Sequence, residues 1–417
     1  MQARTLHISM MFVSSFLGTL AGTVSMVYQV EVVRLDALQL VLIGTTMEAT
    51  VFLFEVPTGV VADLHSRRLS VLIGYLLRGA GLILMGWVPM FWAVAVSSFL
   101  AGIGHTFVSG AKEAWLVDEL ISEHGTDDTV GDTFLRSSQA SSAGSMFAIP
   151  LGVYLGWQNL ATPILIGGGG TIALAFVLVF LMRERGFRPV PPAARETWAS
   201  MRATLSTAYT HVRREHYLIL ILGISLIYGL SSEGYDRLTA PHLLRDFDLP
   251  FPDSVKPVAW FGLISFVSEL ISIGMSEIAR RNLDLRRGSV VSATLMLTNA
   301  GMVIAIVCLA WTDLFWAALA WIWVTSALRR TGGPLLTTWY NQQIQDPTVR
   351  ATLFSVQGQA DAVGQVVGGP PAGLIGRAIS VGWGITASAM MLSLVIPIFG
   401  FSAIRISRRE RDDDRPS

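Results

Sequence analysis

The chain has 417 residues, of which 52% are hydrophobic and 14% are charged, and its 30 basic residues balance its 30 acidic ones. Soluble domains usually carry about 25% charged residues, so this composition excludes an ordinary set of soluble domains. A net charge of zero also excludes a bulk electrostatic attraction to nucleic acid. Long runs of apolar residues instead predict helices that span a lipid bilayer.

Twelve such spans are predicted in chain order. They cover approximately residues 8–30, 37–62, 69–88, 91–114, 133–156, 160–182, 217–240, 257–279, 288–311, 314–340, 351–376 and 380–404. The first span is too long for the apolar core of a signal peptide and many spans follow it, so we expect it to be retained. The sequence therefore predicts an all-α membrane protein.

The arginines lie in alternate loops of this predicted topology. They cluster at Arg67 and Arg68, and within residues 183–214, 280–287 and 405–415. The positive-inside rule places these loops and both termini in the cytoplasm, although the acidic loop at 118–132 runs against it. The longest polar connection, residues 183–216, is expected to be a cytoplasmic linker, and residues 195–211 within it have the pattern of an amphipathic surface helix.

The linker divides the chain into two predicted six-helix bundles that resemble each other. The bundles cover residues 1–182 and 217–406, and a cytoplasmic tail follows at 407–417. Glu55, Asp63 and Arg67 recur at an offset of 214 as Glu269, Glu277 and Arg281, and His105 and Trp115 recur at an offset of 224 as Arg329 and Trp339. Gln139, Gly144, Pro150 and Gly156 recur at an offset of 220 as Gln359, Gly364, Pro370 and Gly376. Because six spans separate the copies, the halves share one membrane orientation, as in transporters built from parallel repeats.

The loop after the second span carries a recognisable motif, Gly59-Val-Val-Ala-Asp63-Leu-His-Ser-Arg67-Arg68. A glycine, an acid four residues later and a basic pair resemble the signature of the major facilitator superfamily, and the resemblance extends along the whole chain. The wider string, residues 54–59, resembles bacterial multidrug efflux members. The chain departs from the signature at Leu64, where a basic residue is usual, and at Ser66, where glycine is usual.

This resemblance implies a major facilitator fold of twelve transmembrane helices in two pseudo-repeat bundles. It also implies a monomer in a bacterial-type inner membrane that carries a small-molecule substrate. Glycine in the motif allows two helices to approach closely, and the charges are expected to latch one conformation of a two-state carrier. The predicted latch residues are Gly59, Asp63, Arg67, Arg68, Glu277 and Arg281. Plain positive-inside anchoring with a helix cap is the alternative.

Ionisable residues inside the predicted spans are the second group of candidates. Each costs about 2.5–3.5 kcal/mol on insertion scales, so each needs a partner or a water-filled cavity. The candidates for proton coupling or substrate binding are Glu55, Arg78, His105, Glu113, Glu233, Asp236, Glu269, Arg329, Arg330 and Asp361. Opposite signs are available for pairing between spans, for example Arg329 or Arg330 with Asp361 or Glu233, and Glu269, Asp361 and Arg329 are the preferred site residues. Buried ion pairs that only fix helix register are the alternative.

Polar aromatic and amide side chains are expected to line a central cavity or to face lipid. The residues are Tyr28, Gln29, Tyr228 and Trp321. His105 has no second histidine or cysteine at metal-ligand spacing, so neither a metal site nor a cofactor is expected. Glycine–proline strings at residues 144–152 and 364–373 fit either an antiporter motif or ordinary helix packing.

The absence of known nucleotide-binding and catalytic motifs limits the energy sources that could drive transport. The chain has no phosphate-binding glycine loop, no His-Glu-x-x-His sequence and no Gly-x-Ser-x-Gly turn, which argues against an ATP-driven pump and against an enzyme. The sequence favours secondary active export of lipophilic or cationic small molecules in exchange for protons. Proton symport or facilitated uptake of a nutrient, lipid export and a non-transporting sensor are the alternatives.

Overall fold

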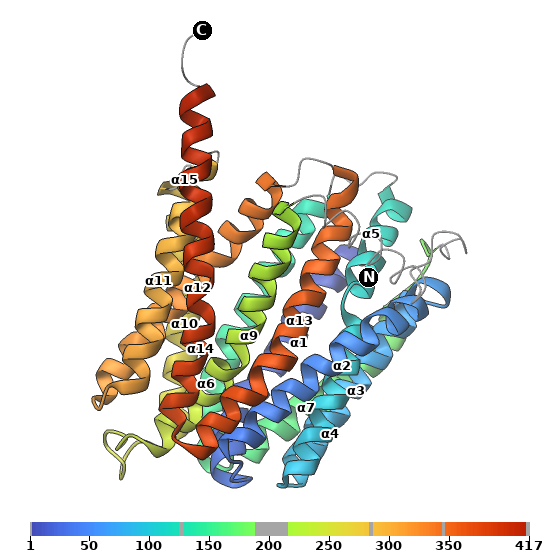
Figure 1. The fold of residues 1–417 in the computed structure, drawn as a ribbon. Helices are drawn as coiled ribbons and strands as arrows, with labels where there is room; N and C mark the ends of the chain where they lie inside the picture. The colour runs from blue at the N-terminus through green and yellow to red at the C-terminus, as the bar shows by residue number, and fades with distance from the viewer. Residues whose placement is uncertain (1, 125–128, 188–215, 283–286, 344–346, 414–417) are drawn as a thin grey trace. The chain divides into compact units, whose positions relative to one another are not determined.

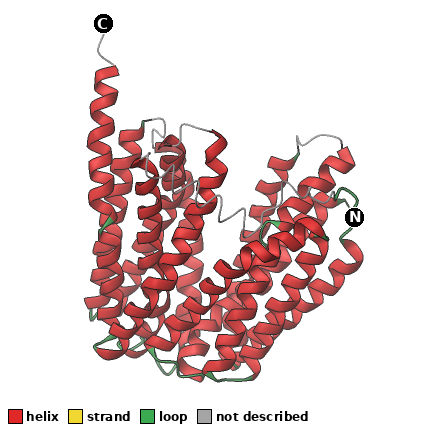
Figure 2. Ribbon diagram, turned by 45° about the vertical axis from the view of Figure 1, so that its right-hand side comes forward, coloured by secondary structure: helices red, strands yellow, loops and turns green. Residues whose placement is uncertain are grey.

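The chain is described by a computed structural model over residues 2–124, 129–187, 216–282, 287–343 and 347–413. All the regular structure in these ranges is helical (Figures 1 and 2). The predicted amphipathic helix at 195–211 lies outside the described residues, as does most of the predicted linker.

The helices of the first half follow the predicted spans closely. They are α1 (Ala3–Val27), the π-helical turn η1 (Tyr28–Val32), α2 (Ala37–Leu64), α3 (Arg67–Trp87), α4 (Phe91–Val108), α5 (Ala111–His124), α6 (Val130–Gln158) and α7 (Ala161–Leu181).

The helices of the second half repeat this order. They are α9 (His216–Arg245), α10 (Pro257–Asn282), α11 (Gly288–Trp311), α12 (Phe315–Gln343), α13 (Pro347–Ala378), α14 (Val381–Ser393) and α15 (Val395–Asp413). Each of the twelve predicted spans thus coincides with one helix or with two consecutive ones, and the predicted all-α fold is confirmed.

Within the described residues, seven of the spans are apolar enough to cross a membrane by length and composition alone. They begin at Ala3, Ala37, Arg67, Phe91, Ala161, Gly288 and Val381. The other five predicted spans lie on α6, α9, α10, α12 and α13, which are 26 to 32 residues long but fall outside this apolar group. The helices of the second half that carry the candidate charges are all among those with the weaker apolar signal.

Two predicted boundaries are wrong, each for a local reason. The fourth span is interrupted at Gly110, whose φ of 74° is a left-handed conformation that glycine adopts without strain. The chain turns there and continues as α5, so the segment 118–124, predicted as an acidic loop, is helical. The last helix runs to Asp413, well into the predicted tail at 407–417.

The described chain groups into two compact units. The first comprises residues 1–35, 46–203 and 251–266, and the second comprises residues 36–45, 204–250 and 267–417. In the first unit α1 packs on α6, and α3 packs on α4 and α7. In the second, α9 packs on α13 and α14, and α11 packs on α12, α14 and α15. The cores are centred on Tyr75 and Trp115 in the first unit and on Trp339 and Phe399 in the second.

The same backbone contact recurs in the two units. A Cβ atom added at Gly144 of α6 would meet the Phe12 carbonyl oxygen and would lie 3.1 Å from the Phe16 nitrogen of α1. A Cβ added at Gly364 of α13 would meet the Leu226 carbonyl oxygen and would lie 2.8 Å from the Leu230 nitrogen of α9. Phe12 and Phe16 correspond to Leu226 and Leu230 at an offset of 214, so the sequence repeat extends to helix packing.

We expect Gly364→Ala to lower the thermal stability of the purified protein, because overpacking against backbone atoms that cannot move costs about 1–3 kcal/mol. Gly358→Ala is the matched control on the same helix, since a Cβ there meets no heavy atom within 4 Å. Alanine in place of an exposed helical glycine is expected to stabilise by up to about 1 kcal/mol. Equal melting temperatures of the two variants in detergent would contradict the close contact at Gly364.

Candidate functional site

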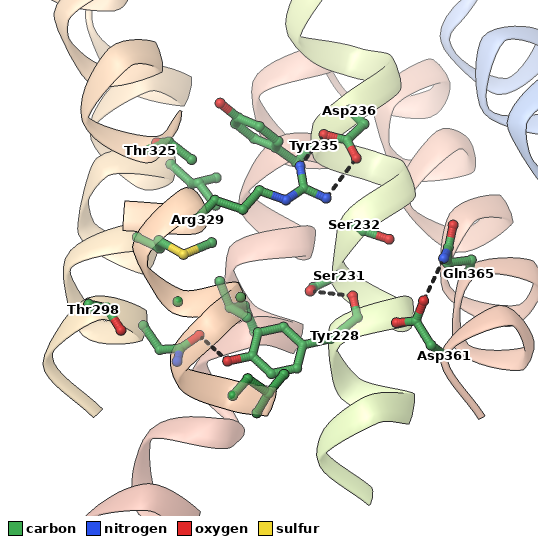
Figure 3. Close-up of a pocket in the computed structure, with 17 residues that line it drawn as sticks. Tyr228, Ser231, Ser232, Tyr235, Asp236, Thr298, Thr325, Arg329, Asp361 and Gln365 are labelled. Carbon is green, nitrogen blue, oxygen red and sulfur yellow. Dashed lines mark hydrogen bonds and ion pairs between the residues drawn. The ribbon is translucent and has the colours of Figure 1, made fainter. Parts of the chain in front are cut away.

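The second unit contains a cavity of about 260 Å³ between its helices (Figure 3). Five helices contribute side chains to it. The lining consists of Tyr228, Ser231, Ser232, Tyr235 and Asp236 from α9, Thr298, Asn299, Met302 and Ile306 from α11, Thr325, Arg329, Gly332, Gly333 and Leu336 from α12, Asp361 and Gln365 from α13, and Leu392 from α14.

One wall of the cavity is a polar face of α9. Tyr228, Ser231, Ser232 and Tyr235 follow the i, i+3, i+4, i+7 spacing that places side chains on one side of a helix. The hydroxyls of Ser231 and Ser232 donate to carbonyl oxygens of their own helix, over 2.9 and 3.1 Å. Their oxygens keep the capacity to accept a hydrogen bond from a guest in the cavity.

The opposite wall supplies a fixed amide on α11. The Tyr228 hydroxyl donates to Asn299 Oδ1 over 2.9 Å, and Asn299 Nδ2 donates to the Leu295 carbonyl oxygen over 2.7 Å. Asn299 is buried, and both ends of its amide are engaged. This link holds α9 and α11 at a set distance and closes one side of the cavity (Figure 3).

An arginine–aspartate pair lies in the cavity. Arg329 of α12 donates from both Nη atoms to the two carboxylate oxygens of Asp236 on α9, over 2.5 and 2.9 Å. The side chains are 46% and 40% exposed, which reflects their position on the cavity wall. A two-pronged pair of this kind fixes orientation as well as charge, because the guanidinium and carboxylate planes match.

Asp361 of α13 is the second carboxylate of the cavity. Its Oδ2 accepts a hydrogen bond from Gln365 Nε2 over 2.8 Å, one helical turn along (Figure 3). Among the described residues it forms no ion pair. Since Arg329 and Asp236 cancel each other's charge, the ionised carboxylate of Asp361 gives the cavity one net negative charge. The arrangement can accept a proton or a cationic group.

The structure brings together four of the residues that the sequence singled out: Tyr228, Asp236, Arg329 and Asp361. Four other candidates of the second half, Glu233 among them, do not line the cavity. Glu269 is half-buried on α10, Arg330 is exposed on α12, and Trp321 is one turn before Thr325, whose hydroxyl donates to the Trp321 carbonyl oxygen over 2.8 Å.

Arg329 has a different partner from the two named as examples. Arg329 pairs with Asp236 rather than with Asp361 or Glu233. Glu233 is buried on α9 and pairs with Arg237 of the same helix over 3.2 Å. Residues four apart on one helix are neighbours, so this pair needs no second helix.

Two predicted cavity residues of the first half are packing residues instead. Tyr28 and Gln29 are buried in the π-helical turn. The Tyr28 hydroxyl donates to the Met85 carbonyl oxygen of α3 over 2.9 Å, and Gln29 Nε2 approaches Met85 Sδ over 3.8 Å. They tie the end of the first span to α3.

The charged candidates of the first half lie on four different helices. Arg78 is half-buried on α3, where it packs against Gly104 of α4. His105 and Glu55 are exposed on α4 and α2. Glu113 of α5 approaches its neighbour Lys112 over 3.4 Å. Arg78, Lys112 and Glu113 all act electrostatically on His105, so three of these four candidates lie within reach of one another.

The signature loop forms a polar network within the first unit. Arg67 pairs with Asp118 of α5 and donates to the Ala114 carbonyl oxygen over 2.7 Å. Ser66 caps α3, accepting from the Leu69 nitrogen over 2.9 Å, and its hydroxyl donates to Glu184 after α7 over 2.5 Å. Serine at the position usual for glycine thus has a structural role in this chain.

The structure describes the side-chain surroundings of three of the remaining latch residues. A Cβ at Gly59 meets no described heavy atom within 4 Å, so the expected close helix approach is not seen there. Asp63 is half-buried and forms no ion pair with another described residue. Arg68 donates its backbone nitrogen to Glu184 Oε1 over 3.1 Å and its side chain to the Val179 carbonyl oxygen. The side chains of Glu277 and Arg281 lie outside the described residues.

Sequence reasoning missed most of the polar lining of the cavity. The missed residues are Ser231, Ser232, Tyr235, Thr298, Asn299, Thr325 and Gln365. The α9 residues could have been found from their helical spacing within an otherwise apolar span. Thr298 and Asn299 are a polar pair in an uncharged span, but their alignment with α9 depends on the packing of α11, which a single sequence does not show.

Comparison with known proteins identifies relatives that are described as membrane transporters. The Major Facilitator Superfamily model matches residues 6–369. The uncharacterized MFS-type transporter YxaM of Bacillus subtilis (strain 168) is 20% identical over 387 residues, which cover 88% of each chain.

Solved structures share the fold over nearly the full length. The nucleoside transporter NupG is 13% identical with a TM-score of 0.72 and coverage of 98% of this chain and 99% of NupG. The peptide transporter POT in complex with sulfate is 15% identical with a TM-score of 0.72 and coverage of 97% and 95%. A bacterial homologue of the human lysosomal transporter Spinster is 15% identical with a TM-score of 0.70 and coverage of 100% and 99%.

We expect Arg67 and Asp118 to be energetically coupled. Arg67→Gln and Asp118→Asn should each lower the melting temperature, and the double variant should lose less than the sum, because contacting charged groups show coupling energies of about 0.5–3 kcal/mol. Thermal unfolding of the four proteins in detergent measures this cycle. If the loss of melting temperature in the double variant equals the sum of the two single losses, the ion pair between Arg67 and Asp118 is contradicted.

Proposed function

The chain belongs to the Major Facilitator Superfamily, and we propose that it exports lipophilic or cationic small molecules in exchange for protons. Membership makes it a multi-pass membrane protein and a secondary transporter rather than an enzyme. The observation that carries the proposal is Asp361, a carboxylate that lines the cavity and that, among the described residues, accepts one hydrogen bond, from the neutral amide of Gln365.

The chemistry of Asp361 suits exchange. A carboxylate inside the membrane region binds either a proton or a cation, because binding of the proton removes the charge that attracts the cation. If the cavity opens alternately to the two sides, a proton taken up from one side displaces the cargo there and is released on the other. The two ligands are then transported in opposite directions.

The rest of the cavity suits an amphipathic cation. Tyr228 and Tyr235 offer ring faces that attract positive charge, and Met302, Ile306 and Leu336 offer apolar surface. We place the protein in a bacterial-type inner membrane as a monomer with both termini cytoplasmic. The pair of Arg67 and Asp118 then lies on the cytoplasmic side and serves as one part of the conformational latch.

Proton-coupled uptake of a polar nutrient is the second candidate, and the lining favours it in one respect. Hydroxyl and amide groups outnumber the apolar side chains around the cavity, and such groups recognise hydrogen-bonding cargo. By their names, NupG is a nucleoside transporter and POT a peptide transporter, so the fold accommodates cargo of that kind. The direction of proton-driven flux separates the two candidates.

We expect Asp361→Asn to abolish transport of tetraphenylphosphonium driven by a pH gradient in proteoliposomes, because the neutral amide binds neither a proton nor a cation. Asp313→Asn is the matched control, an exposed aspartate in the loop after α11, and should transport at the wild-type rate. Accumulation of the cation is measured on the side of the membrane that the protons leave. A parallel experiment with an uncoupler, which removes the pH gradient, is the reference.

Three further outcomes bear on this proposal. Movement of nucleosides or dipeptides in the same direction as protons would favour uptake over export. Gradient-driven export that persists in Glu269→Gln, Asp361→Asn and Arg329→Gln alike would refute the assignment of the site to the three preferred residues. Export without a pH response in the wild type would refute proton coupling.

A further inference from the structure

The cavity holds one arginine and two aspartates, each from a different helix. Arg329 lies on α12, Asp236 on α9 and Asp361 on α13, and all three line the same 260 Å³ space (Figure 3). Arg329 is engaged by Asp236 with both of its Nη atoms. Its charge also acts on Asp361 across the cavity. The guanidinium therefore has a second carboxylate within electrostatic reach.

The choice between the two partners decides the charge of the site. Paired with Asp236, Arg329 leaves Asp361 as a free anion. Paired with Asp361, it would neutralise that anion and occupy the space that a cationic guest needs. Arginine has a long side chain with several rotatable bonds, and both carboxylates line the same cavity as Arg329. Something must hold it at Asp236.

Two observed features favour the Asp236 partner. The paired geometry uses both oxygens of Asp236, which is the strongest arrangement available to a guanidinium and a carboxylate. Asp361, in contrast, is oriented by the Gln365 amide, which occupies one lone-pair direction without supplying a charge. Gln365 therefore keeps Asp361 in place while leaving its charge intact.

We propose that Asp236 is a positioning residue that holds Arg329 away from Asp361 and thereby makes the cavity selective for organic cations. This inference rests on the proposed function, in which Asp361 binds the cationic cargo. It assigns different roles to the two aspartates, although both lie in the same cavity: Asp361 binds the guest, and Asp236 neutralises the arginine.

The first test is structural and needs no ligand. In a cryo-EM structure of Asp236→Asn, the guanidinium of Arg329 is expected within about 4 Å of the Asp361 carboxylate, the usual limit for an ion pair. A guanidinium that stays beside the substituted side chain on α9 would overturn the inference. Because this readout does not involve transport, it tests the positioning role even if the cargo is not a cation.

The second test measures tetraphenylphosphonium binding to the purified full-length protein. Asp236→Asn should weaken binding at least about tenfold, since the freed arginine cancels the binding charge. The double variant D236N/R329Q should recover affinity to within about threefold of wild type, because the competing cation is gone while Asp361 remains. Asp236→Glu, which keeps the charge, should bind like wild type.

The outcomes separate a positioning role from a merely structural one. If Asp236 only stabilised the fold, removing Arg329 as well would not restore binding, and the double variant would be as weak as D236N. Binding by D236N at wild-type affinity would also overturn the inference. Wild-type binding by Asp361→Asn would instead refute the proposed cargo site, and the structural test would still decide the position of Arg329.

Discussion

The site depends on one backbone contact, the approach of α13 to α9 at Gly364. A Cβ atom at this position would lie 2.9 Å from the Cα of Gly229 on α9, so two glycines face each other and the helices meet backbone to backbone. Glycines at helix interfaces allow this separation because no side chain intervenes. Asp361 lies one turn before Gly364 and Gln365 directly after it, so the contact that joins the helices also brings both polar side chains to the wall of α9 that carries Tyr228 and Ser232.

The first unit repeats the contact with different chemistry around it. Gly144 meets α1 as Gly364 meets α9, and its neighbours are hydroxyls: Ser145 interacts with Ser15 over 2.8 Å and with Thr19 over 2.9 Å. The residue equivalent to Asp361 is Ser141, at the same offset of 220. A duplicated helix pair therefore preserves the packing that sets helix positions, while the carboxylate occurs in one copy. Packing and charge are specified by different residues, so the charge of the helix pair could change without loss of its packing.

The sequence predicted the helices well because a helix that spans a bilayer needs a long apolar run, and such runs can be recognised directly in the sequence. It predicted less about side-chain partners. Pairing depends on how each helix is rotated about its axis, and a single sequence does not contain the rotation. Tyr28, expected to line a cavity or to face lipid, is buried and donates to Met85, and Arg329, for which Asp361 and Glu233 were named as possible partners, binds Asp236. The interactions that could be read directly are those within one helix, such as Gln365 with Asp361, because four-residue spacing fixes them.

The carboxylates of the signature-loop network and of the cavity differ in how many hydrogen-bond donors they have, and the difference has a physical meaning. In the signature-loop network of the first unit, Glu119 accepts from the backbone nitrogens of Arg185 and Gly186 over 2.5 and 2.7 Å, and Glu184 accepts from Ser66 and Arg68. Each of these carboxylates has at least two donors, so moving it would cost hydrogen bonds. Among the described residues Asp361 has one donor, and it lines the cavity. A carboxylate with unused acceptor capacity gains free energy by binding a proton or a guest, so Asp361 is suited to the chemistry of a carrier, whereas Glu119 and Glu184 are suited to holding its structure.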